Sequence, residues 1–396
     1  MTHSKSPTYP LEGSPHLLLT GAAGFLGSHV LLDWLERYPD AQVFCPVRGP
    51  NDRGRLEQAL LTAARDAGKP GRIDTLLPRI TVADADLQTP GVLALPLAAW
   101  RHRAQSYHVL HCAANLSFRE EERQAVFAAN VDGTRNLLAA IAQQPGALSF
   151  NYVSTAYVAG LKQGRVFEDD REERGFNNAY EESKWQAEQC IRECTERLGL
   201  GMRIFRPSIV IGHTATHRIS SSSGLYKVVE MLHRLGLNRA VHHCQVHVPT
   251  RPSANLNLIP VDIVVAEMLT IMAGGSQTLG DVYHLTNERP LSIADVFFGI
   301  SPLTGMKLEC TLETPNKAAD PLTALVLRQL RHYLPYLIQN RVFDRRNVHA
   351  CQASKWQEDF WLDLVRLRQF VQTFLAETAQ QAEEAAATPR ERELQP

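Results

Sequence analysis

The stretch His16-Leu-Leu-Leu-Thr-Gly-Ala-Ala-Gly-Phe-Leu-Gly27 decides the fold. Its apolar start predicts a buried strand, and the spacing of apolar residues from Ser28 to Tyr38 predicts a helix. The turn between them carries Gly21, Gly24 and Gly27. Glycine at these positions permits a tight turn, a close approach of the backbone to a ligand, and close packing of the helix on the strand.

The same turn predicts a site for the pyrophosphate of a dinucleotide. The N-terminus of the following helix offers free N–H groups and the positive end of the helix dipole. A glycine pattern alone is a weak signal, but this one directly follows a strand and directly opens a helix. A glycine-rich turn without a ligand is the alternative. The candidate positions are Gly21, Ala23, Gly24, Phe25, Leu26 and Gly27.

Further short apolar runs alternate with helical stretches along the chain. Strands are predicted at residues 42–47, 80–82, 107–111, 149–153, 202–205 and 282–286. This alternation predicts an α/β fold, a Rossmann-type doubly wound parallel sheet with a smaller, mostly helical C-terminal substrate domain. The predicted divisions are a flexible N-terminus (1–15), a Rossmann domain (16–212, with strands near 259–286 returning to it), a substrate-binding region (213–376) and a frayed or disordered tail (377–396).

The end of the second strand distinguishes between the two nicotinamide cofactors. An acidic residue there would bind the ribose of NAD, but this chain has Arg48, with Arg55 shortly after. A guanidinium favours the 2′-phosphate of NADP, although Arg48 as an ordinary solvated side chain is the alternative. After the third strand, Asp86 and Leu87 are predicted to border the adenine, with Asp84 as a competing candidate.

Tyr180 and Lys184 are spaced to share one face of a helix. A free phenol has a pKa near ~10, and a neighbouring ammonium is expected to lower it toward the range useful for acid–base work. Lys184 is also expected to hold the nicotinamide ribose. A predicted strand ends in two adjacent hydroxyls, of which Thr155 is the first choice for orienting a carbonyl and Ser154 the second.

Composition restricts the class of protein. The 396 residues are 44% hydrophobic and 21% charged, with a formal net charge of −1, so nothing favours nucleic acid or an anionic membrane as a partner. No apolar run approaches the ~18 residues of a membrane span, and no signal peptide is recognisable. Seven dispersed cysteines are typical of reduced thiols in a cytoplasmic protein.

Several stretches together resemble one branch of the extended short-chain dehydrogenase/reductase superfamily, the thioester reductase and fatty acyl-CoA reductase (male-sterility-type) proteins. The resemblance covers roughly residues 17–291, with the motifs in the family's order. It is carried by Thr20-Gly-Ala-Ala-Gly-Phe-Leu-Gly27, His111-Cys-Ala-Ala-Asn-Leu-Ser-Phe118, Asn130-Val-Asp-Gly-Thr134, Val153-Ser-Thr-Ala-Tyr-Val158, Tyr180-Glu-Glu-Ser-Lys184, Arg206-Pro-Ser-Ile-Val-Ile-Gly212 and Ile259-Pro-Val-Asp262.

The resemblance implies roles for individual residues. It assigns Thr155, Tyr180 and Lys184 to catalysis and Arg48 to the phosphate of NADP. It places Ala113 and Ala114 on the nicotinamide side, and Pro207 and Ser208 at the carboxamide. Asn115, Asn130 and Ile209 are further candidates for binding the cofactor. Two departures stand out, because the family usually has Gly where this chain has Ala85, and His213-Thr-Ala-Thr-His217 replaces the usual stretch after Gly212.

The resemblance implies a reductase that uses NADPH to convert an acyl thioester into an aldehyde, and by a second hydride into an alcohol. The thioester is expected on CoA or on a carrier protein that comes in trans, because no carrier segment is fused to the chain. One alternative is an extended reductase, dehydrogenase or epimerase acting on a ketone, an alcohol or a sugar nucleotide. Another is a non-catalytic scaffold that binds NADP.

For three further clusters of side chains, a structural interpretation is favoured over a functional one, and no metal site is predicted. The histidines 233, 242, 243 and 247 with Cys244 fit a solvated loop better than zinc, because their spacing matches no standard pattern. Trp356, Phe360 and Trp361 fit helix packing better than an acyl pocket. Five arginines fit a solvated helix face better than a site for CoA phosphates: Arg328, Arg331, Arg341, Arg345 and Arg346.

Overall fold

A seven-stranded sheet forms the centre of the molecule, and all its pairs are parallel. Its strands are β1 (Leu17–Thr20), β2 (Val43–Val47), β3 (Ile80–Asp84), β4 (Tyr107–His111), β5 (Ala147–Val153), β7 (Met202–Pro207) and β12 (Val282–Leu285). They lie in the order β12-β7-β5-β4-β1-β2-β3. This computed structural model describes residues 11, 13–71, 73–220, 224–251, 253–312, 320–358 and 360–387.

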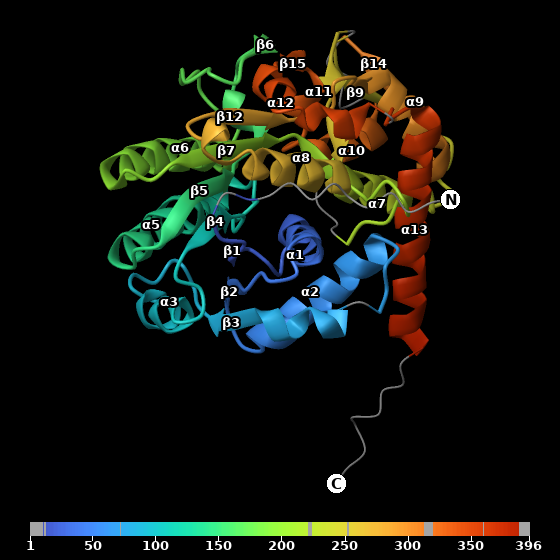
Figure 1. Cartoon of the computed structure of the whole chain (residues 1–396). Helices are drawn as coiled ribbons and strands as arrows, with labels where there is room; N and C mark the ends of the chain where they lie inside the picture. Colours follow the sequence, from blue (N-terminus) through green and yellow to red (C-terminus); the bar gives the residue numbers. More distant parts are fainter. Residues whose placement is uncertain are drawn as a thin grey trace.

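Helices cover both faces of the sheet (Figure 1). One face carries α1 (Phe25–Arg37), α2 (Asp52–Asp66) and α8 (Val261–Ala273), and the other carries α3 (Ala94–Arg101), α5 (Gly133–Gln143) and α6 (Ala179–Leu198). Each face has its own buried apolar layer, because strands covered on both sides are apolar throughout. The predicted Rossmann fold is confirmed.

The strand order indicates which edge of the sheet is expected to bind a ligand. β1 lies between β2 and β4, so the chain winds outward from β1 in both directions. Ligands of open α/β sheets bind at such a reversal point, beyond the carboxyl ends of the strands. The glycine turn after Thr20 and the loop after His111 therefore meet there, since these two residues are paired neighbours in the sheet.

A second unit with its own apolar core is built mainly from the later part of the chain. Its main helices are α7 (Leu225–Gly236), α9 (Ile293–Thr304), α10 (Pro321–Leu330) and α13 (Leu364–Ala387), and the strands β9 (Gln245–Pro249) and β14 (Lys307–Thr311) pair beside them. In contrast, α8 and β12 belong to the Rossmann layers, because α8 packs on α1 and β12 pairs with β7.

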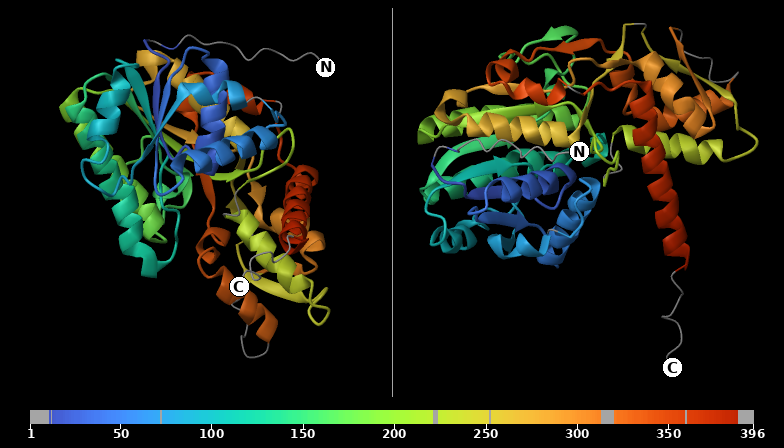
Figure 2. Two further views of the ribbon diagram at one scale, coloured as in Figure 1. Left: turned by 90° about the horizontal axis from the view of Figure 1, so that it is seen from below. Right: turned by 45° about the vertical axis from the view of Figure 1, so that its right-hand side comes forward.

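The last helix leaves this second unit and runs beside the Rossmann layers (Figure 2). Glu377 of α13 pairs with Arg218 at 3.0 Å. α13 extends to Ala387, so residues 377–387 of the predicted frayed or disordered tail are helical. Residues 388–396 of that tail lie outside the described part of the chain, as do residues 1–10 and 12 of the predicted flexible N-terminus.

The segment before α13 folds back onto the Rossmann domain. It contains α11 (Leu334–Leu337) and β15 (Arg341–Phe343), and β15 pairs in parallel with β6 (Gly164–Val166). Figure 1 shows β6 and β15 together at one edge of the molecule. No helix among the described residues has both the length and the apolar character needed to cross a membrane.

Candidate active site

The glycine turn has the geometry of a phosphate cradle. Gly21 has φ +71°, and a Cβ there would lie 2.6 Å from the backbone nitrogen of Ala113. A Cβ on Gly27 would lie 2.1 Å from the carbonyl oxygen of Gly21. Gly24 is the N-cap of α1, and no side chain caps the helix. The first turn of α1 therefore keeps its N–H groups available for an anion, as a dinucleotide requires.

A buried histidine joins the two loops that meet at this edge. His111 Nδ1 lies 2.6 Å from Thr20 Oγ1, and its Nε2 lies 2.9 Å from Thr134 Oγ1. The backbone N–H of Ala113 also donates to Thr20 Oγ1. Burial lowers the pKa of His111 to about 3, so the ring is neutral and serves as a hydrogen-bonding strut. Sequence reasoning missed this role, because it depends on β1 lying beside β4.

The side of the turn predicted to border the adenine is open and charged. The Arg48 side chain is 66% exposed, and its guanidinium lies 4.0 Å from the Asp86 carboxylate. Arg55 donates to the backbone oxygen of Arg48, so it braces the turn. Asp84 accepts the N–H of Gly49, which leaves Asp86 as the carboxylate beside Arg48. The carbonyl oxygen of the adjoining Leu87 accepts from Asn136 Nδ2.

Thr155, Tyr180 and Lys184 come together at the carboxyl end of β5. Thr155 favours the ionised form of the Tyr180 phenol, against the effect of burial, so the two side chains lie close together. Lys184 is 1% exposed, its Nζ donates to the carbonyl oxygen of Val153 at 2.6 Å, and it lies 4.2 Å from the centre of the Tyr152 ring. Ser154, the alternative to Thr155, is buried with its hydroxyl beside Glu188.

The electrostatics of the pair differ from the expectation. Burial raises the pKa of Tyr180, and burial lowers the pKa of Lys184 to about 7. The predicted lowering of the tyrosine pKa by Lys184 is therefore wrong for the protein alone. Desolvation is the largest cause for both groups, because each charged form loses its hydration. A phenol in this state keeps its proton at neutral pH and donates it.

A π-helical turn (Ala128–Asp132) carries Asn130, which fixes the loop beyond β4. Asn130 Oδ1 accepts the N–H of Asn115 at 2.7 Å, and Nδ2 donates to the Asn115 carbonyl and to Ser183 Oγ. Asn130 is 1% exposed. It therefore ties the loop that contains Ala113 and Ala114 to the helix that carries Tyr180.

The remaining predicted contacts lie at the end of β7. Thr155 Oγ1 is 3.5 Å from the carbonyl oxygen of Pro207. The Ser208 hydroxyl donates to Asn257 Oδ1 at 2.6 Å, and Ile209, at the start of β8 (Ile209–Ile211), is half-buried. The structure brings these residues to the same edge as Thr155, with the side chain of Ser208 already engaged.

Aromatic side chains lie around the phenol of Tyr180. Phe118 lies 5.7 Å from Tyr180 and stacks on Tyr336 at 5.7 Å between ring centres. Tyr333 lies 5.9 Å from the same Phe118 ring. Phe118 belongs to a motif that the sequence singled out, whereas the contact of residues 333–336 with the site was not predicted.

The arginine stretch divides into two groups. Arg345 is buried and binds Glu267 Oε1 at 2.7 Å, and Arg341 is buried with its guanidinium on the carbonyl oxygens of Gly160 and Lys162. Arg346 pairs with Asp344 at 2.6 Å. The solvated-face reading is therefore wrong for Arg341 and Arg345, which hold the C-terminal segment in place. Arg328 and Arg331 are exposed.

The histidine and tryptophan clusters singled out in the sequence make structural contacts. His233 and His242 hydrogen-bond to the carbonyl oxygens of Leu303 and Gly236. Among the described residues, no group of three or more His, Cys, Asp or Glu side chains could hold a metal ion. Trp356 donates to Thr270 Oγ1 at 3.0 Å and packs on the Rossmann core, while Trp361 is exposed under Arg289.

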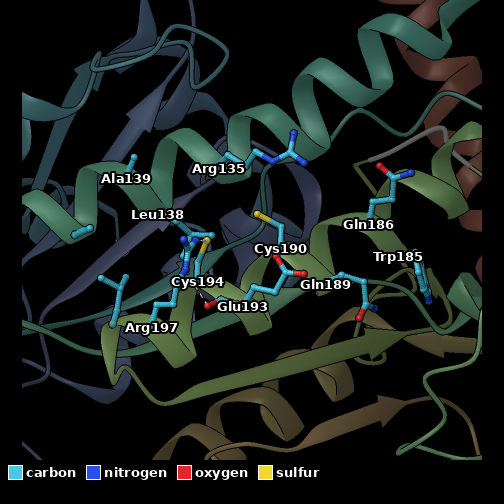
Figure 3. Close-up of a pocket in the computed structure, with 12 residues that line it drawn as sticks. Arg135, Leu138, Ala139, Trp185, Gln186, Gln189, Cys190, Glu193, Cys194 and Arg197 are labelled. Atoms are coloured by element: carbon cyan, nitrogen blue, oxygen red, sulfur yellow. Dashed lines mark hydrogen bonds between the residues drawn. The ribbon is translucent and has the colours of Figure 1, made fainter.

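A hollow of about 690 Å³ lies on the other side of α6 from this site, against α5 (Figure 3). Arg135, Trp185, Cys190, Cys194 and Arg197 are among its lining residues. Arg197 Nη2 lies 3.1 Å from Cys194 Sγ. None of the predicted catalytic or cofactor residues lines this hollow, so it is separate from the candidate active site.

Comparisons with known proteins agree with this geometry. A family model described as male sterility protein matches residues 19–268. The isonitrile lipopeptide synthase of Mycobacterium tuberculosis is 28% identical over 69% of this chain and 12% of its own length. The carboxylic acid reductase of the same organism is 27% identical over 68% of this chain and 24% of its own length. The chain thus spans a quarter or less of these curated relatives.

Among solved structures, the terminal R domain from the myxalamid PKS-NRPS biosynthetic pathway superposes with a TM-score of 0.73. The match covers 93% of this chain and 92% of that domain, at 24% sequence identity. This likeness extends over both the Rossmann layers and the second unit, and it concerns the fold.

Proposed function

The chain belongs to the male sterility protein family and is an NAD(P)H-dependent oxidoreductase, and we propose that it uses NADPH to reduce an acyl thioester to an aldehyde. The observation that carries the proposal is the placement of Thr155 and Tyr180 together with buried Lys184 at the carboxyl end of β5. The similarity to a carboxylic acid reductase supports an acyl substrate. The acyl group would arrive on CoA or on a carrier protein.

Each residue of the site has a defined task in this reaction. The glycine turn and α1 would hold the pyrophosphate, and Lys184 would hold the ribose. When bound, the reduced nicotinamide supplies the hydride. Thr155 and Tyr180 donate hydrogen bonds to the thioester oxygen as negative charge develops there. The phenol of Tyr180 gives its proton to that oxygen, and the resulting hemithioacetal loses the thiol to leave an aldehyde.

The test is NADPH oxidation with a panel of acyl-CoAs, from short to long chain, and with an acylated carrier protein. Mass spectrometry of the products would identify aldehyde or alcohol together with free thiol. Such turnover supports the proposal and shows whether a second reduction follows. Silence with every thioester, combined with turnover of a ketone or a sugar nucleotide, would overturn it.

The preference for NADPH depends in this proposal on Arg48. Replacing Arg48 with alanine is expected to lower kcat/KM for NADPH about 10- to 100-fold, since a guanidinium–phosphate contact is a strong charge-assisted hydrogen bond. The value for NADH should change by less than about threefold, because NADH lacks that phosphate. Steady-state kinetics with both cofactors measure this. Arg135→Ala, at an exposed arginine paired with Asp132, is the control. Equal losses with both cofactors would contradict the assignment.

A further inference from the structure

The hydroxyl of Tyr336 joins the C-terminal segment to the start of the catalytic helix. It donates to Glu181 Oε1 at 2.6 Å and accepts from Asn178 Nδ2 at 2.8 Å. Tyr336 is 8% exposed and Glu181 is fully buried. These two hydrogen bonds connect residues more than 150 positions apart in the chain.

Asn178 and Glu181 form the N-terminal cap of α6. Asn178 is the N-cap, and its Oδ1 accepts the N–H of Glu181 at 3.1 Å. Glu181 reaches back so that Oε2 accepts the N–H of Asn177 at 2.8 Å. This reciprocal arrangement resembles a capping box, with Asn and Glu three residues apart. Tyr180 lies between these two residues, in the first turn of the helix.

The rings around Tyr336 leave its hydroxyl little freedom. Phe118 stacks on one face, and Tyr157 meets it edge-on at 5.1 Å between ring centres. Arg341, five residues later, hydrogen-bonds to the carbonyl oxygens of Gly160 and Lys162, and β15 pairs with β6. The segment that carries Tyr336 is therefore held against residues 160–166 of the Rossmann domain.

We propose that Tyr336 is a positioning residue, whose hydroxyl fixes the first turn of α6 and through it the phenol of Tyr180. The inference rests on the proposed role of Tyr180 as proton donor. A small displacement of that phenol lengthens its hydrogen bond to the substrate oxygen, and such misplacement costs rate rather than cofactor binding. The C-terminal segment thereby becomes part of the active site without touching the substrate.

The test compares Tyr336→Phe with Tyr107→Phe, which also removes a hydroxyl that donates one hydrogen bond, to the Gln144 carbonyl. Tyr336→Phe is expected to lower kcat about tenfold or more, with KM for NADPH within about twofold, because an interaction important in the transition state is weakened. Amide hydrogen exchange in residues 179–184 should become faster in Tyr336→Phe and stay at the wild-type rate in Tyr107→Phe. Retained kcat, unchanged exchange, or an equal loss in Tyr107→Phe would each overturn the inference.

Glu181→Gln provides a second route, should Tyr336→Phe fold poorly. It keeps the shape of the side chain but leaves one oxygen to serve both Tyr336 and Asn177. A loss of kcat with faster exchange in residues 179–184 is expected here as well, and wild-type behaviour would overturn the inference. The exchange measurement needs no substrate, so it still decides this inference if no thioester is reduced and the proposed function fails.

Discussion

Replacing Tyr180 with phenylalanine is expected to reduce kcat about 10²- to 10⁴-fold, the range of a positioned general acid. The change removes the proton donor and leaves the ring against Phe118. KM for NADPH should stay within about twofold, because the phenol acts on the substrate oxygen rather than on the cofactor. Thr155 remains to donate one hydrogen bond, so residual activity above background is expected.

Saturating kinetics with an active acyl thioester and NADPH measure this effect, and fluorescence titration measures cofactor binding. Tyr107→Phe is a matched control, since its hydroxyl donates to the Gln144 carbonyl far from the site. The control should keep kcat and lose only a little stability. A Tyr180→Phe enzyme with near-wild-type kcat would remove Tyr180 from the mechanism and, with it, the argument for Tyr336.

The pH dependence of kcat follows from the same residue. Because burial raises the pKa of Tyr180, the phenol stays protonated through neutral pH. The general acid is lost only when the pH rises through that raised value, so no basic limb from Tyr180 is expected below about pH 10. A kcat that falls between pH 7 and 8 would contradict this prediction, and a pH profile at saturating substrates measures it.

The sequence predicted those features whose causes are local. The glycine turn is recognisable because tight backbone approach excludes a side chain at Gly21 and Gly27, whatever the rest of the chain does. Tyr180 and Lys184 share a helix face because of their spacing alone. The parallel sheet follows from apolar runs that alternate with helices.

Features that depend on distant partners were not predictable in this way. Arg345 was read as part of a solvated face, but its carboxylate partner Glu267 lies 78 positions earlier. The contact of Tyr336 with Glu181 spans 155 positions. The pKa of Tyr180 was expected to fall because Lys184 is near in sequence, and burial, which no local pattern reveals, reverses the direction. Burial and long-range pairing are properties of the assembled fold.

Replacing Lys184 with methionine is expected to have two opposite effects. Turnover should fall about 10³-fold or more, since the group proposed to hold the ribose, one helical turn from Tyr180, is lost. The protein without cofactor should become more stable at pH 6, with a Tm higher by about 2–6 °C. The reason is that Lys184 is 1% exposed and its ammonium loses hydration on folding, whereas methionine loses none.

The sign of the pH dependence distinguishes this cause from better packing. The folded pKa of Lys184 is lowered from 10.5 to about 7, so the unfolded chain binds more protons between those values. The stability of the wild type therefore rises with pH through this window, and the stability of Lys184→Met lacks this rise. The advantage of the variant should be full at pH 6 and shrink toward pH 10. Thermal unfolding across this range measures the difference.

Kinetics supply the second readout. If charged Lys184 holds the ribose, kcat/KM for NADPH in the wild type should fall as the pH rises through about 7, the pKa of Lys184 in the free enzyme.

Lys227→Met, at an exposed lysine of α7, should show neither the stability gain nor the kinetic loss. A Lys184→Met protein less stable than wild type at pH 6 would mean that the bond to Val153 and the contact with Tyr152 outweigh desolvation. The lysine would then stabilise the fold at pH 6, and the predicted gain in stability would be wrong.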